Sequence, residues 1–140
     1  MQPNQANIAG NVHGGEIMKL MDNVAGIVAA KHARSNVVTA RVDKLEFHYP
    51  IKIGNLVTCQ AKLSFVGNSS MEVFVKVLVE DVTKEASAKV VSTAFFTMVA
   101  LDEYGKPMTV PSLEITSDEE SDLFDEGKKR YLTHKQELNK

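Results

Sequence analysis

The sequence has only one cysteine, no excess of positive charge and no long apolar run. Because Cys59 has no second thiol to pair with, an intrachain disulfide is excluded. The formal net charge of -2 argues against a basic surface for nucleic acid or an anionic membrane. The apolar runs are far shorter than the ~20 residues of a spanning helix, and the first residues lack the basic and apolar parts of a signal peptide. We therefore expect a cytoplasmic protein without membrane or nucleic-acid partners.

Two common kinds of catalytic site are also missing. The four histidines, at positions 13, 32, 48 and 134, have no metal-ligand spacing and there is no cysteine pair, so we predict no metal site. A Gly-x-Ser-x-Gly elbow is absent, which disfavours a serine hydrolase. What the sequence does have is 140 residues, of which 44% are hydrophobic. That is enough for the core of one domain and too short for two.

Apolar residues at helical spacing follow an Asn-rich loop over residues 1–12. They predict a helix from Glu16 to about His32. The residues that set the period are Ile17, Leu20, Met21, Val24, Ile27 and Val28. Alanines fill much of the rest, so the helix is apolar nearly all round and should be buried on several sides. A small monomer could not cover all of these sides, so we expect an oligomer.

Four long strands are predicted after this helix. They cover Val37–Phe47, Leu56–Val66, a segment from Met71 in which valines alternate with polar residues, and Ala88–Leu101. We expect tight turns to join these consecutive strands, which makes an antiparallel meander of all four. The preceding helix must then lie against one face of the sheet. The fold class is therefore α+β, with a long, curved antiparallel sheet wrapped round a central helix.

The C-terminal segment differs from the rest in composition. Ser117 to Glu120 has the pattern of a capping box. Residues 118–138 then run from acidic to basic, as suits a helix dipole. We predict a surface helix here, and we divide the chain into a domain over residues 1–111 and a helical tail over 112–140.

Gly14 and Gly15 stand where the loop enters the predicted helix. Free N–H groups at a helix start can bind an anion or an oxyanion, and glycine lets a ligand approach the backbone. The alternative is that these glycines only ease packing at the helix entry. The sequence alone leaves both interpretations open.

Asp22 is the one acidic residue in the middle of this apolar helix. It must find a partner there, or its pKa rises, which would suit a general base. Alternatively it faces solvent or makes a structural hydrogen bond at a subunit interface. Asp22 lies eight residues beyond Gly14, which is ~12 Å along a helix. One helix cannot easily bring both groups to one carbonyl, whereas an antiparallel copy from a two-fold partner could.

The segment from Asn7 to Asp22, with Ala25-Gly26-Ile27 after it, resembles the signature of the hotdog acyl-CoA thioesterases. It is most similar to the brain-type acyl-CoA hydrolases and their bacterial single-domain relatives. Weaker landmarks follow at Val38-Thr39-Ala40, Phe47 to Ile51, Ile53-Gly54 and Val66 to Ser70. The resemblance covers roughly residues 3–101. It implies a hotdog fold, assembly as a hexamer built as a trimer of dimers, and no cofactor beyond the CoA of substrate and product.

The resemblance also implies site residues. Those matching Asn7 and Asp22 form the active pair across a subunit interface, and a helix-entry glycine N–H, at Gly14 or Gly15, polarises the thioester carbonyl. Asn68, Ser69 and Ser70 would contact CoA, although an ordinary hairpin turn explains them equally well. His13 is a further candidate CoA contact, with a structural role at the helix entry as the simpler interpretation. Family members usually have a strand before the Asn7 loop, so we expect that edge strand to be absent or reduced to a stub at Met1–Asn4.

Taken together, these patterns predict an acyl-CoA thioesterase that releases a free fatty acid and CoA. Asp22 would activate water or attack directly. One alternative is a hotdog hydratase or dehydratase, which would release no thiol. The other is a non-catalytic acyl-CoA binding module. The acyl chain length cannot be derived from these motifs.

Overall fold

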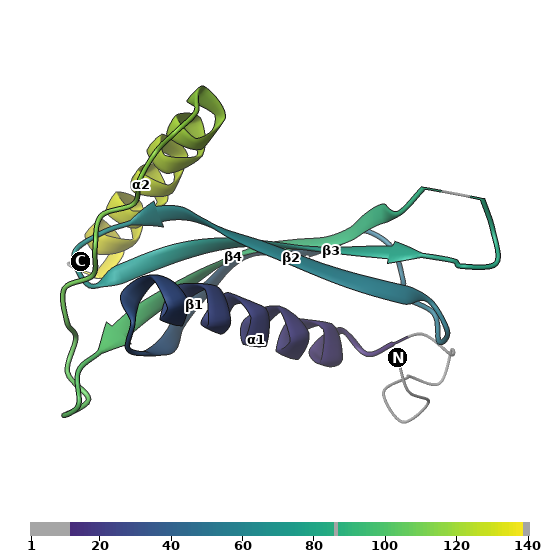
Figure 1. Cartoon of the computed structure of the whole chain (residues 1–140), viewed down its shortest axis with the longest axis horizontal. Coiled ribbons are helices and arrows are strands. Elements are labelled where there is room, and N and C mark those ends of the chain that lie inside the picture. Colours follow the sequence, from purple (N-terminus) through teal and green to yellow (C-terminus); the bar gives the residue numbers. More distant parts are fainter. Residues whose placement is uncertain (1–11, 86, 139–140) are drawn as a thin grey trace.

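A computed structural model describes residues 12–85 and 87–138. Two helices and four strands follow one another along the chain (Figure 1). They are α1 (Gly14–Ala33), β1 (Asn36–Phe47), β2 (Leu56–Val66), β3 (Ser70–Glu80), β4 (Lys89–Leu101) and α2 (Asp118–Leu138). The predicted helices and strands are confirmed, with ends that differ by a residue or two. The predicted loop over residues 1–12 and the stub at Met1–Asn4 lie outside the described residues, except for Val12.

The four strands form one antiparallel sheet in the order β1-β4-β3-β2. The meander prediction is right for β2, β3 and β4 and wrong for β1, which pairs with β4 instead of β2. The link over residues 48–55 is too long for a tight turn and carries the chain from one edge of the sheet to the other. Within the link, the Ile51 carbonyl accepts a hydrogen bond from the N–H of Val12, at 2.7 Å. This bond fixes the link beside the entry to α1.

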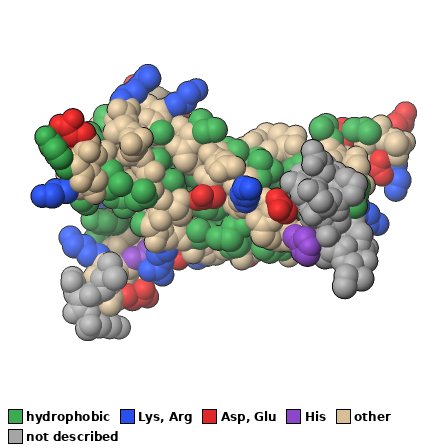
Figure 2. All heavy atoms as spheres, turned by 90° about the horizontal axis from the view of Figure 1, so that it is seen from below, with side chains coloured by type: hydrophobic (Ala, Val, Ile, Leu, Met, Phe, Trp, Pro, Cys, Tyr) green, Lys and Arg blue, Asp and Glu red, His purple; other side chains and the backbone are tan. Residues whose placement is uncertain are grey.

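Helix α1 lies along one face of the sheet (Figure 1). Its buried residues recur every four positions and form a single stripe: Ile17, Met21, Ala25, Ala29 and Ala33. The stripe packs across all four strands, and on β3 Met71, Val73, Val75 and Val77 are fully buried. The described residues cover the rest of the helix only in part, since Met18 is 37% and Ile27 59% exposed. The expectation of burial on several sides is therefore not met within one chain (Figure 2).

Helix α2 packs on the opposite face of the sheet, against β2 (Figure 1). The ring of Phe65 lies 4.9 Å from that of Phe124 and 5.4 Å from that of Tyr131, measured between centroids. Between them Gly127 is buried, and a Cβ there would lie 2.6 Å from the Cβ of Phe65. A glycine is needed at this position because the helix comes so close to the sheet.

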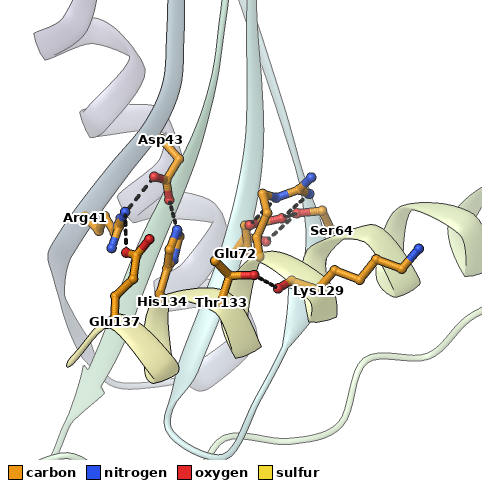
Figure 3. Close-up of polar contacts among 9 residues, drawn as sticks. Arg41, Asp43, Ser64, Glu72, Lys129, Thr133, His134 and Glu137 are labelled. Carbon is orange, nitrogen blue, oxygen red and sulfur yellow. Dashed lines mark hydrogen bonds and ion pairs between the residues drawn. The ribbon is translucent and has the colours of Figure 1, made fainter. Parts of the chain in front are cut away.

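A buried ion pair joins α2 to the sheet beside this contact (Figure 3). The Arg130 guanidinium donates from Nε to Glu72 Oε2 at 2.9 Å and from Nη2 to Glu72 Oε1 at 2.7 Å. Ser64 donates a further hydrogen bond to Glu72 Oε1 at 2.7 Å, and Arg130 lies over the ring of Phe95. The hydrogen bonds to Glu72 raise the pKa of Arg130. Glu72 is only 5% exposed. Because water cannot solvate its carboxylate there, the guanidinium of Arg130 supplies the neutralising charge.

The start of α2 confirms the predicted capping box. Ser117 Oγ accepts the N–H of Glu120 at 3.1 Å. The Glu120 carboxylate reaches back to the N–H and the hydroxyl of Thr116, one residue earlier than the usual partner. These bonds, the backbone one first, lower the pKa of Glu120.

Candidate active site

The entry to α1 presents two backbone N–H groups. The helix begins at Gly14, and His13 before it makes no side-chain cap. The His13 carbonyl accepts the N–H groups of Glu16 and Ile17, at 3.0 and 3.3 Å. By helix geometry the N–H groups of Gly14 and Gly15 have no intrahelical acceptor. They can therefore point at a ligand, with the positive end of the helix dipole behind them.

The space around Gly14 and Gly15 shows whether packing requires a glycine at either position. A Cβ on Gly14 would lie 3.4 Å from the ring of Phe47, an ordinary contact. A Cβ on Gly15 would meet no atom of the described residues within 4 Å. Neither glycine is required by packing against the residues that the structure describes. This favours the interpretation in which a ligand approaches the backbone here.

A cavity of about 270 Å³ adjoins this helix entry. Its walls come from the helix start and from the link that follows β1: Val12, Gly14, Ile17, Phe47, His48, Tyr49, Pro50 and Ile51. Two segments that the sequence motifs single out separately, the helix entry and Phe47 to Ile51, thus form one cavity.

Asp22 lies two turns further along α1 and is half-buried. The hydroxyl of Thr39, on β1, donates to Asp22 Oδ1 at 2.5 Å. Among the described residues, no lysine, arginine or histidine lies within ion-pairing distance of this carboxylate. The partner that this carboxylate finds on the apolar helix is therefore a neutral hydroxyl and not a cation.

Thr39 is the residue that the motifs did not assign a role. It lies next to an irregularity in the pairing of β1 with β4, between Thr39 and Arg41. Its own landmark, Val38-Thr39-Ala40, was recognisable in the sequence. The presence of a hydroxyl side chain in that landmark, on the strand directly after the helix, could have indicated a hydrogen-bond partner for Asp22. Only the packed structure shows which helix residue it meets.

The turn at Asn68, Ser69 and Ser70 lies at the other end of the sheet from the helix entry. The N–H of Ala100 bonds the Ser69 carbonyl at 3.0 Å, and Ala100 pairs with Val37 at the start of β1. The helix-entry cavity lies at the end of β1, ten residues further on. At 3.3 Å per residue this separates the two places by roughly 33 Å. One chain therefore does not bring this turn to Gly14, and a second copy would have to.

His13 and Asn7 are the other two residues that the sequence motifs suggested for the site. His13 is exposed, and the contacts described for it are made by its backbone. Asn7 lies outside the described residues. Within residues 12–85 and 87–138, no three His, Cys, Asp or Glu side chains gather as metal ligands would. Over the same residues, neither helix has the length and apolar character needed to cross a bilayer.

Comparison with known proteins agrees with this architecture. The model of the thioesterase superfamily matches residues 9–86. The cytosolic acyl coenzyme A thioester hydrolase of Mus musculus is 45% identical over 134 residues, which are 95% of this chain and 35% of that protein. The chain thus spans about a third of the length of that relative.

Two solved structures are similar over nearly the whole chain. A hexameric acyl-CoA thioesterase without ligand has a TM-score of 0.90 at 32% identity, covering 99% of this chain and 88% of its own. A Staphylococcus aureus acyl-CoA hydrolase, solved with butyryl coenzyme A, coenzyme A and coenzyme A disulfide, has a TM-score of 0.82 at 35% identity. It covers 98% of this chain and 87% of its own. The chain belongs to the thioesterase superfamily and has the hotdog fold.

Proposed function

We propose that this protein hydrolyses acyl-CoA thioesters to a free acid and CoA. The observation that carries the proposal is the arrangement on α1: two N–H groups without an intrahelical acceptor at its entry, and a carboxylate held by Thr39 two turns later. The N–H groups suit a developing oxyanion, and the Asp22 carboxylate suits a water molecule that must lose a proton. The named activities of the relatives support the same reaction.

In the proposed mechanism, the thioester carbonyl accepts the N–H of Gly14 or Gly15. Asp22 takes a proton from water as the water oxygen bonds to the carbonyl carbon. The C–S bond then breaks, and the CoA thiolate leaves and takes up the proton. Direct attack by Asp22, with an anhydride that water later opens, satisfies the same geometry. Asn7 orients the water or the carbonyl, and no metal or other cofactor takes part.

The spacing of three residues supports their assignment. The S. aureus hydrolase has been solved with single alanine substitutions of an asparagine, of an aspartate fifteen residues later and of a threonine seventeen residues after that. Asn7, Asp22 and Thr39 have the same two spacings in this chain. We therefore propose Thr39 as a positioning residue that holds Asp22.

We further propose that the site is shared between two copies of the chain. Gly14 and Asp22 are ~12 Å apart along one helix, while a carbonyl and its attacking water are only ~3 Å apart. Met18, one turn before Asp22 on the same face of α1, is exposed, and so is Val38 on β1, which is an edge strand of the described sheet. A partner that covers both surfaces would bring its own Asp22 to Gly14. Hexameric relatives support a trimer of such dimers.

The domain division and the location are part of the same proposal. Residues 1–111 would carry the thioesterase site, and residues 112–140 would brace the far side of the sheet. The cytosolic rodent relative supports a cytosolic location.

The test is an assay of thiol release from a panel of acyl-CoA substrates of different chain length. Release of free thiol, with one thiol per acid formed, is the expected result. Conversion of an enoyl-CoA without thiol release would instead identify a hydratase. Tight binding of acyl-CoA with no turnover by the oligomer would identify a binding module. Either of these results would contradict the proposed function.

A further inference from the structure

A second cavity, of about 360 Å³, lies beside the one at the helix entry. It lies where the link after β1 meets the hairpin between β3 and β4. Its lining residues are Tyr49, Pro50, Lys52, Asn55, Val79, Asp81, Lys84, Ser87 and Lys89. Tyr49 and Pro50 also line the helix-entry cavity, so the two cavities share a wall.

The charges around this second cavity are unequal. Three lysines face one aspartate. Asp81 is already committed, because it accepts the N–H and the hydroxyl of Thr83 and lies 3.8 Å from Lys84 Nζ. Within the described part of the chain, Lys52 and Lys89 have no carboxylate in ion-pairing distance. Two ammonium groups are therefore available to an anion.

The ammonium group of Lys89 makes a cation–π contact with the ring of Tyr49. Lys89 Nζ lies over the ring, 3.7 Å from its centroid. Because Tyr49 belongs to both cavities, the ammonium lies near their common wall. Along β4, Lys89 is three residues beyond Ser92, which pairs with Phe47 of the helix-entry cavity. Three residues of strand are ~10 Å, a distance that the pantetheine arm of CoA can span.

We propose that Lys52 and Lys89, with Lys84 at the rim, bind the phosphates at the nucleotide end of the acyl-CoA substrate. The inference rests on the proposed function, in which the thioester lies at Gly14 and Gly15. Phosphates carry most of the charge of CoA and are bound in proteins by cationic side chains. The turn at Asn68 to Ser70 offers hydroxyl and amide groups but no positive charge. It can hydrogen-bond CoA from a partner chain, and the lysine cavity supplies the neutralisation.

The test compares two substrates that differ only in the nucleotide end: an acyl-CoA and the S-acyl-pantetheine of the same acid. In a variant with Lys52→Gln and Lys89→Gln, the KM for acyl-CoA should rise about tenfold while kcat changes less than about twofold. That is the pattern of lost uniform binding. The KM for acyl-pantetheine should not change. A variant with Lys52→Arg and Lys89→Arg should keep most of the affinity for acyl-CoA.

A matched control changes two exposed lysines on α2, with Lys128→Gln and Lys129→Gln. This control removes the same net charge and should leave both substrates unaffected. Equal changes for the two substrates, or no change for either, would overturn the lysine assignment. Wild-type protein that hydrolyses neither substrate would contradict the proposed function instead. In that case calorimetry with CoA decides the lysine assignment: weaker binding in the Lys52→Gln, Lys89→Gln variant supports it, and equal or undetectable binding overturns it.

Discussion

Glu72 lies on one side of the sheet and Asp22 on the other, and these two carboxylates have opposite surroundings. On the α2 side, Glu72 is buried and is bonded by Arg130 and Ser64. On the α1 side, Asp22 is half-buried and is bonded by the hydroxyl of Thr39. Arg130 neutralises Glu72 and fixes it in place, which is a structural role. The Thr39 hydroxyl orients Asp22 and brings no positive charge, which suits the general-base role proposed for Asp22.

The comparison predicts opposite consequences when each carboxylate is removed. Asp22→Ala should lower kcat about a hundredfold or more, because a general base contributes at least that much. The fold should remain intact, since the core under α1 does not depend on this side chain. The measurement is thiol release, with circular dichroism and oligomer size as controls. Near wild-type turnover in a correctly assembled variant would refute the assignment.

Glu72→Ala should instead act on stability. It leaves the Arg130 guanidinium buried without its partner, which typically costs about 3 kcal/mol. We expect a clear fall in the thermal unfolding midpoint, and nearly unchanged turnover per folded molecule below it. Replacing both partners, with Glu72→Met and Arg130→Met, should recover most of the loss. A variant that unfolds like wild type but loses turnover would reverse the roles of the two carboxylates.

Gly127→Ala tests how closely α2 packs on the sheet. The added Cβ would lie 2.6 Å from Phe65 Cβ and 3.0 Å from Glu72 Oε1. Overpacking of this kind costs about 1–3 kcal/mol, and the better helix propensity of alanine offsets about 1 kcal/mol of it. A modest net destabilisation is expected in urea unfolding. Glu126→Ala, at the exposed neighbouring position, is the control and should have almost no effect. A stabilised Gly127→Ala protein would show that α2 is not so closely packed.

The smallest expected effect concerns the turn between β2 and β3. Changing Ser69→Ala and Ser70→Ala together should raise the KM for acyl-CoA a few-fold and leave kcat nearly unchanged. Steady-state kinetics over a range of acyl-CoA concentrations measures this. If the KM does not move, the turn is an ordinary hairpin, and CoA contacts must be sought elsewhere.

Much of this fold could be predicted from local patterns. The helical spacing of apolar residues from Ile17 to Val28 predicted α1, and the alternating valines from Val73 to Val79 predicted β3. The place of β1 could not be predicted in this way, because strand order depends on where the link over residues 48–55 runs in space. The Glu72–Arg130 pair was missed for the same reason, since its members are 58 residues apart.

The candidate site was predictable only in part. Gly14, Gly15 and Asp22 stood out because each breaks an apolar or helical pattern. Thr39 did not, because threonine is common in strands and its role depends on the helix residue opposite. Lys52 and Lys89 are likewise ordinary surface lysines in the sequence. They become a candidate phosphate site only when the fold brings them to one cavity beside Tyr49.

The central claim is that one chain supplies the carbonyl donors and its partner supplies Asp22. The most direct measurement mixes two inactive variants, Asn7→Ala and Asp22→Ala, after unfolding and refolding them together. In a mixed dimer one composite site carries both substitutions and the other carries neither. Random pairing makes half of the dimers mixed, so about a quarter of all sites should be intact and active. If mixed dimers are shown to form but remain as inactive as the parents, the site lies within one chain and the shared-site mechanism is wrong.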